Sequence, residues 1–171
     1  MARFNYWYFA YDLAKARPLT GGGLATFTPA LFLQYAPDPL DFHAAHSIYF
    51  EILGETGFIG LGLFLTLFTS AYVTAGRTAK RARGSPELAW TVDLLTMCQV
   101  SLVCYATGGA FLGLGYFDLP YTIVAIIMVT WRHVDDTLKN AEILPQIRPA
   151  RPTILPRETP SSETRRVGEA S

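Results

Sequence analysis

Charge is scarce in this sequence of 171 residues, since only 16% of the residues are Asp, Glu, Lys or Arg, whereas half are hydrophobic. Two long stretches, residues 58–75 and 94–117, contain no charged residue at all. About 20 apolar residues suffice for a helix to cross the roughly 30 Å of hydrocarbon in a bilayer. We therefore expect an all-α, polytopic membrane protein in which both stretches span the membrane.

A third apolar run, residues 119–131, is short for a span. Asp118 can cap the start of a helix there, and Pro120 suits its first turn. Arg132 can extend its charged group to the far interface. We expect this run to span as well, which gives three transmembrane helices within residues 58–133.

Cysteine is rarer still. The sequence contains two, Cys98 and Cys104, both inside the second predicted span. Residues six apart on a helix point in different directions, so these two cannot form a disulfide with each other. We expect both to be packing residues.

Motifs of common cofactor sites are also missing. Gly21-Gly22-Gly23 lacks the Lys-Ser/Thr of a P-loop, so we interpret it as a turn and not as a phosphate site. Asp41, His43, His46 and Glu51 include residue types that bind zinc, but their spacing matches no zinc motif. The sequence therefore predicts neither a metal nor another cofactor.

The positive charges are unevenly distributed along the chain. Arg77, Lys80, Arg81 and Arg83 lie between the first two predicted spans, and seven further basic residues follow Trp131, so that eleven of the 14 lie in these two segments. By the positive-inside rule, the 77–87 loop and the C-terminal tail are cytoplasmic, and residues 1–57 and a turn at residues 115–118 lie outside. Topology alone accounts for this basic loop, so we expect no nucleic-acid partner.

The outer and inner segments differ in composition. Residues 1–57 open with an aromatic-rich, amphipathic stretch that suits a membrane interface, and Pro18 ends it. Thr28-Pro29 predicts the start of a short helix that runs through Tyr35. Residues 134–171 form the tail, in which recurrent proline from residue 142 onward predicts disorder.

A secretory signal is not evident at Met1, although the first segment is predicted to lie outside. We therefore expect the chain to be the C-terminal part of a longer polytopic protein, with the missing N-terminal spans as its partners.

Polar groups run directly into the first predicted span, from residue 46 to residue 60. His46, Ser47, Glu51 and Glu55 are costly to place at the mouth of an apolar helix, which makes them candidate functional residues. Solvation by headgroups and water is the alternative for each of them. Glu51 and Glu55 share a helical face, so either one is protonated or an arginine lies between them.

The spacing of this stretch resembles a known signature. His46-Ser47, nine residues and then Gly57-x-x-Gly60 are similar to the H-[N/S/Q]-x9-G-x-x-G motif of the O-antigen ligase and polymerase superfamily of bacterial membrane glycosyltransferases. Arg3-x-x-x-Trp7 and residues 17–27 resemble the segment that precedes this motif. Residues 36–43 and 108–120 are similar to the branch called exosortase A-associated O-glycosylation ligases.

This resemblance implies a multi-pass enzyme of the bacterial inner membrane. Its members transfer a glycan from an undecaprenyl-diphosphate carrier to a hydroxyl of a glycan, a lipid or a protein Ser or Thr on the periplasmic side. By motif position, His46 would be the base, and Arg3 would bind the diphosphate. We assign Ser47, Glu51 and Glu55 to substrate binding as well. Members of the superfamily have many more spans than three.

The residue types suit this chemistry. A hydroxyl is a weak nucleophile at neutral pH, and an imidazole, with an ordinary pKa of about 6.5, can remove its proton during attack. Guanidinium groups stabilise the diphosphate leaving group. A polymerase of the same superfamily is the first alternative. The second is a membrane fragment that is inactive without its missing spans.

Overall fold

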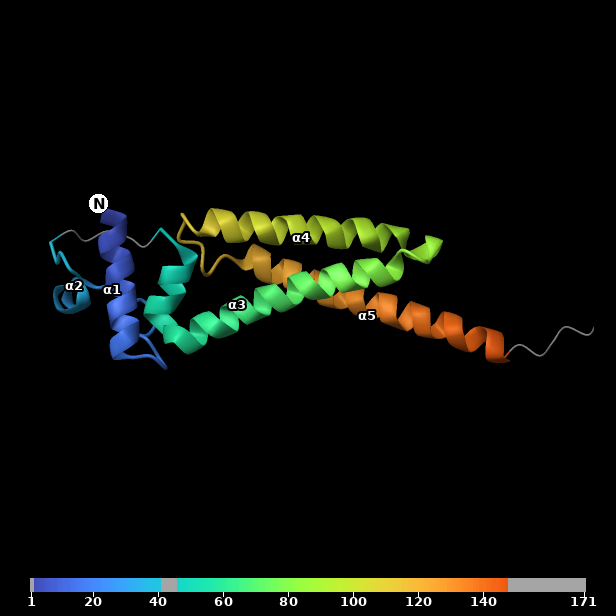
Figure 1. Cartoon of the computed structure of the whole chain (residues 1–171), viewed down its shortest axis with the longest axis horizontal. Helices are drawn as coiled ribbons and strands as arrows, with labels where there is room; N and C mark the ends of the chain where they lie inside the picture. Colours follow the sequence, from blue (N-terminus) through green and yellow to red (C-terminus); the bar gives the residue numbers. More distant parts are fainter. Residues whose placement is uncertain (1, 41–45, 148–171) are drawn as a thin grey trace, which may run out of the picture.

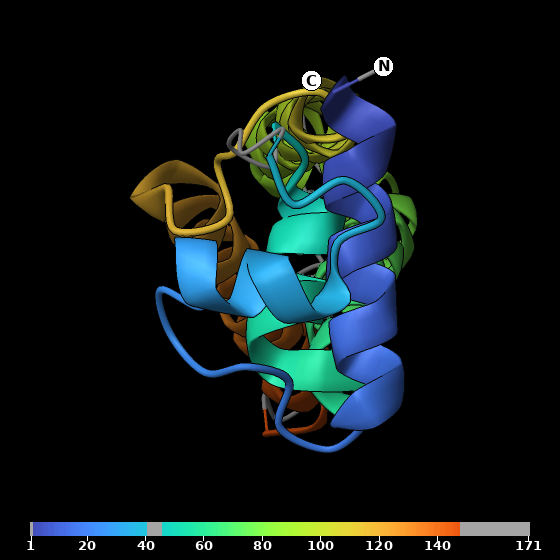
Figure 2. The ribbon, with the colours of Figure 1, turned by 90° about the vertical axis from the view of Figure 1, so that its left-hand side faces the viewer.

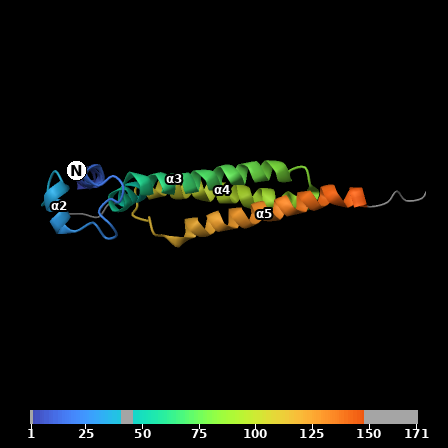
Figure 3. The ribbon, with the colours of Figure 1, turned by 90° about the horizontal axis from the view of Figure 1, so that it is seen from below.

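The computed structural model describes residues 2–40 and 46–147, and over these residues the chain is helical and contains no strand. The elements, in chain order, are α1 (Ala2–Ala16), α2 (Pro29–Tyr35), α3 (Ile48–Ala82), the short 3-10 helix η1 (Pro86–Leu88), α4 (Ala89–Gly109) and α5 (Asp118–Ile147). Helices α3, α4 and α5 lie side by side along the long axis (Figures 1 and 3). Helices α1 and α2 gather at the end where α3 begins, and α1 runs across the long helices (Figure 2).

Two of the described helical segments are long and apolar enough to cross a membrane, namely Ile48–Ala82 and Pro86–Gly109. Only 17% and 28% of their most apolar windows are buried within the chain. The core helix of a soluble domain would be mostly buried by the rest of the chain. The exposed apolar faces of these two segments therefore suit contact with lipid or with further helices. Helix α5 begins at Asp118 as predicted and has 30 residues. It is not among the described helices whose composition is apolar enough to cross a membrane.

Two predicted boundaries were wrong. The second apolar run was expected to span through Phe117, but α4 ends at Gly109 and residues 110–117 form a connecting loop. Gly108 and Gly109 at the end of α4, and Gly113 and Gly115 beyond it, weaken the helix at this end of the run. Helix α5 also continues through residues 142–147, where disorder was predicted. The rest of the tail lies outside the described residues.

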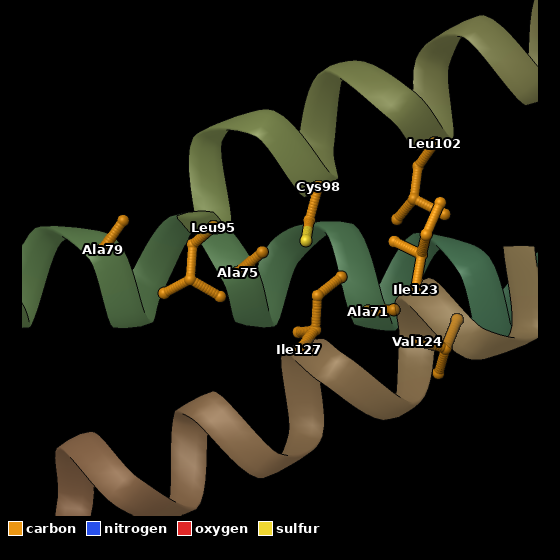
Figure 4. Packing of buried hydrophobic residues seen from close by; sticks show 9 residues of the cluster. All are labelled: Ala71, Ala75, Ala79, Leu95, Cys98, Leu102, Ile123, Val124 and Ile127. Atoms are coloured by element: carbon orange, nitrogen blue, oxygen red, sulfur yellow. The ribbon is translucent and has the colours of Figure 1, made fainter. Parts of the chain in front are cut away.

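Small residues bring the three long helices together. Ala71, Ala75 and Ala79 are spaced by four along one face of α3, where their small side chains allow close approach. The remaining members of this buried cluster are Leu95, Cys98, Leu102, Ile123, Val124 and Ile127 (Figure 4). Cys98 is therefore a packing residue as predicted, whereas Cys104 is exposed.

Helix α1 packs by one aromatic face. Tyr6, Phe9 and Leu13 are buried against Phe32 of α2, whereas Phe4 and Tyr8 remain exposed. Helix α2 starts as predicted, since the Thr28 hydroxyl accepts a hydrogen bond from the amide of Leu31. The aromatic residues near the N-terminus thus form a small core of their own, which lies against the start of α3.

Candidate functional site

Helix α3 is broken at Gly57, between its polar start and its apolar length. Gly57 has φ 71° and ψ −169°, a conformation that is essentially restricted to glycine. A Cβ at this position would lie 2.6 Å from the carbonyl oxygen of Pro18. The same oxygen accepts a hydrogen bond from the amide of Phe58 at 3.0 Å, so Pro18, two residues beyond the end of α1, contacts the backbone at the kink.

The triple glycine caps the helical turns that precede this kink. The amide of Gly22 donates to the carbonyl of Gly54 at 2.8 Å, and that of Gly23 donates to the carbonyl of Glu55 at 2.9 Å. These carbonyls have lost their partners within the helix because the backbone turns at Gly57. The glycine turn therefore holds the backbone of the predicted signature motif in place. The amides of Gly22 and Gly23 already donate these hydrogen bonds.

Glu55 joins two loops that lie far apart in the sequence. Its side chain is only 5% exposed. One carboxylate oxygen accepts a hydrogen bond from the amide of Ala25 at 3.0 Å, and the other accepts one from the hydroxyl of Tyr116. Partial burial, followed by this hydrogen bond and the nearby carboxylates, raises the pKa of Tyr116 above its ordinary value, which keeps the phenol protonated as a donor.

Glu51 contacts the same connecting loop one helical turn earlier. Its Oε2 atom accepts a hydrogen bond from the amide of Gly115 at 3.3 Å. We predicted that a proton or an arginine would relieve the repulsion between Glu51 and Glu55. Within the described ranges, neither carboxylate forms an ion pair with Lys or Arg, and their nearest partners are amides and a phenol.

His46 lies at the exposed end of this arrangement, two residues before α3 begins. Its φ of 44° is uncommon for a residue with a side chain, although histidine is among the residues enriched there. A Cβ placed on Gly113 would lie 4.0 Å from the backbone nitrogen of His46 and 3.6 Å from Oε2 of Glu51. The connecting loop therefore passes beside both residues.

The other predicted site residues have different surroundings. Ser47 is 1% exposed and caps α3 through its carbonyl, which accepts the amide of Glu51 at 3.0 Å. Because Ser47 is buried whereas His46 is exposed, contact of Ser47 with substrate stays a prediction. Arg3 belongs to the first turn of α1, but its side chain lies outside the described residues, as do Asp41 and His43 entirely.

An apolar groove of about 350 Å³ leads away from this site between α3 and α4. It begins at Ile48 and Tyr49 and continues along Phe64, Phe68 and Leu102. The hydroxyl of Tyr49 donates to the carbonyl of Ala106 at 2.8 Å, which ties the two helices together at this end. A long, flexible apolar chain fits a groove of this character.

The sequence predicted a turn at residues 115–118 but did not assign it to the site, and residues 110–114 were assigned to a span. Tyr116, Gly113 and Gly115 are the residues of this loop that contact the carboxylates or lie beside His46. The spacing Gly113-x-Gly115 followed by Asp118 and Pro120 was the available signal, since it is typical of a chain that leaves one helix and starts another.

Comparison with known proteins gives one match. The O-antigen ligase family model matches residues 1–65, a range that includes α1, α2, the glycine turn and the start of α3. No curated protein and no solved structure matches the chain. Over residues 1–65 the chain is thus similar to the O-antigen ligase family, and this similarity supports the ligase and polymerase superfamily that the residue pattern indicated.

Proposed function

We propose that this chain contributes the catalytic histidine of a membrane glycosyltransferase of the O-antigen ligase type, multi-pass in the bacterial inner membrane. The observation that carries the proposal is the position of His46. It is exposed at the start of an apolar helix, beside a loop that Glu51 and Glu55 hold in place. The family match covers this residue and the turns that position it.

The donor would be a glycan on undecaprenyl diphosphate. Its isoprenoid chain would occupy the groove that begins at Tyr49, only three residues from His46. This arrangement would place the diphosphate near the start of α3, where the free backbone amides of a helix N-terminus favour an anion. Arg3 would add a bidentate guanidinium contact to the diphosphate.

The transfer would be a single displacement. The acceptor oxygen attacks the anomeric carbon while the imidazole of His46 takes the hydroxyl proton. The bond between that carbon and the diphosphate oxygen breaks, and the diphosphate leaves with the electron pair. Configuration at the anomeric carbon inverts, and no covalent enzyme intermediate forms. Glu51 and Glu55 would act through the loops that they position, next to the reacting groups.

The product of a defined transfer reaction tests this proposal. The full chain, reconstituted in bilayer vesicles, is supplied with a lipid-linked glycan and, in separate samples, with a second glycan, a lipid or a peptide hydroxyl acceptor. Transfer to a different acceptor identifies a ligase, and elongation of the donor glycan identifies a polymerase. Failure to release undecaprenyl diphosphate with any acceptor would contradict catalysis by this chain.

A further inference from the structure

The opposite end of α3 contains a second candidate site, which the glycan-transfer proposal does not use. A groove of about 400 Å³ lies between α3 and α5 and is lined by Thr74, Arg77, Thr78, Arg81, Met128 and Trp131. Arg77 is separated from Gly57 by roughly 30 Å of helix, at about 1.5 Å per residue. This distance matches the thickness of the hydrocarbon layer, so the groove lies one membrane thickness away from the His46 end.

The groove carries uncompensated positive charge. Arg81 donates to Oδ1 of Asp135 at 2.9 Å, and Lys139 shares the same carboxylate. Arg77 is exposed and forms no ion pair in the described part of the chain. Of the two arginines that line the groove, Arg81 is therefore paired and Arg77 is not, and a guanidinium that lacks a partner is suited to a phosphate oxygen pair.

A hydroxyl group adds a donor next to this guanidinium. Most hydroxyls on these helices bond back to a carbonyl of their own helix, as those of Thr66, Ser70 and Thr130 do. The hydroxyl of Thr74 donates no hydrogen bond among the described residues and lines the groove beside Arg77. It is therefore available to a ligand that offers acceptor oxygens, whereas Thr78, which also lines the groove, is only 1% exposed and belongs to its wall.

An adjoining groove provides room for an apolar chain. It has a volume of about 430 Å³, shares Thr74 and Arg77 with the first groove, and extends along α3 to Leu65 through Val73. Trp131, at the other side of the charged groove, is the residue type that prefers the level of the headgroups. A ligand whose charged headgroup lies between the two arginines and whose apolar tail runs along α3 has the chemistry of a phospholipid.

We propose that the Arg77 groove binds an anionic phospholipid, with its phosphate on Arg77 and Thr74 and an acyl chain along α3 toward Leu65. The site is independent of glycan transfer and lies at the other membrane face. Bound lipid would fix α3 against α5 at this end, where Arg81 and Asp135 already join the two helices.

Lipid retention by the full chain tests the proposal. The protein is equilibrated with equal amounts of phosphatidylglycerol and phosphatidylcholine, and the retained lipids are counted by native mass spectrometry. We expect selective retention of phosphatidylglycerol and about a tenfold loss in Arg77→Lys, because lysine keeps the charge but cannot form the paired hydrogen bonds. Arg83→Lys is the matched control in the same basic segment, lies outside both grooves, and should stay within about twofold of the unchanged protein.

Three results would overturn the proposal. Equal retention of the two lipids would show that the headgroup charge is not recognised. Equal behaviour of the Arg77→Lys and Arg83→Lys variants would attribute binding to general surface charge. Displacement of the retained lipid by inorganic phosphate would assign the groove to a free anion. Helix content measured by circular dichroism identifies any variant that fails to fold, and Thr74→Val then replaces it as the test.

Discussion

The hydroxyl of Tyr116 donates a hydrogen bond to the buried carboxylate of Glu55, across 61 residues of sequence. This contact holds the loop between α4 and α5 against the start of α3. The same carboxylate accepts a hydrogen bond from the amide of Ala25, so one side chain joins three segments at the end of the molecule where α3 begins.

Tyr116→Phe removes this donor and leaves the buried carboxylate of Glu55 with one partner fewer. We expect the free energy of unfolding in detergent to fall by about 1 to 3 kcal/mol, the usual effect of a lost hydrogen bond to a charged group. Tyr8→Phe is the matched control, since Tyr8 is about as exposed as Tyr116, at 58% against 56%, but its hydroxyl donates no hydrogen bond among the described residues. Equal stability of the two variants would mean that the Tyr116 contact contributes nothing to the site.

Gly57→Ala tests the kink in α3. The substitution forces a side chain into a backbone conformation with φ 71° and brings its Cβ to 2.6 Å from a backbone oxygen. Destabilisation by about 3 kcal/mol or more is expected from the strain and the clash together.

Gly62→Ala is the control for this variant. A Cβ there meets nothing within 4 Å, and alanine favours a helix over glycine by up to about 1 kcal/mol. If thermal unfolding shows both variants to be as stable as the unchanged protein, the kink is not a fixed feature of the fold.

The sequence predicted the positions of the elements better than their ends. Thr28 and Asp118 start helices where capping chemistry placed them, and the apolar runs lie in α3 and α4. The second predicted span was too long because hydropathy treats glycine within an apolar run as part of the span, whereas α4 ends at Gly109. The contact between Glu55 and Tyr116 was beyond prediction, since it depends on how α5 returns beside α3.

The membrane topology remains a prediction that the basic residues support. Gln34 and Ser85 lie on opposite sides of the first predicted span, and we expect Gln34→Cys to react with an impermeant thiol reagent in intact cells while Ser85→Cys does not. Both variants are made in a background without Cys98 and Cys104. The reverse pattern of labelling would place His46 on the inner side.

Asp135 should titrate below its ordinary range. The hydrogen bond from Lys139, followed by that from Arg81, lowers the pKa of this carboxyl. The stabilisation from this group is present above the ordinary pKa of about 3.9 and is lost as the pH falls through the lower, folded value. Carbon-13 NMR of the carboxyl measures the pKa directly, and Lys139→Gln should raise it. An ordinary value in the unchanged protein would mean that these contacts are not formed in solution.

The most direct test of the account compares two histidines in the same transfer reaction. His46→Ala should lower the rate of glycan transfer by about 10² to 10⁴, the range for a general base, with membrane insertion unchanged. His133→Ala removes an exposed imidazole at the far end of the molecule, where it lies beside Trp90, and should leave the rate unchanged. Full activity of His46→Ala, measured against the unchanged protein, would contradict the catalytic role of His46.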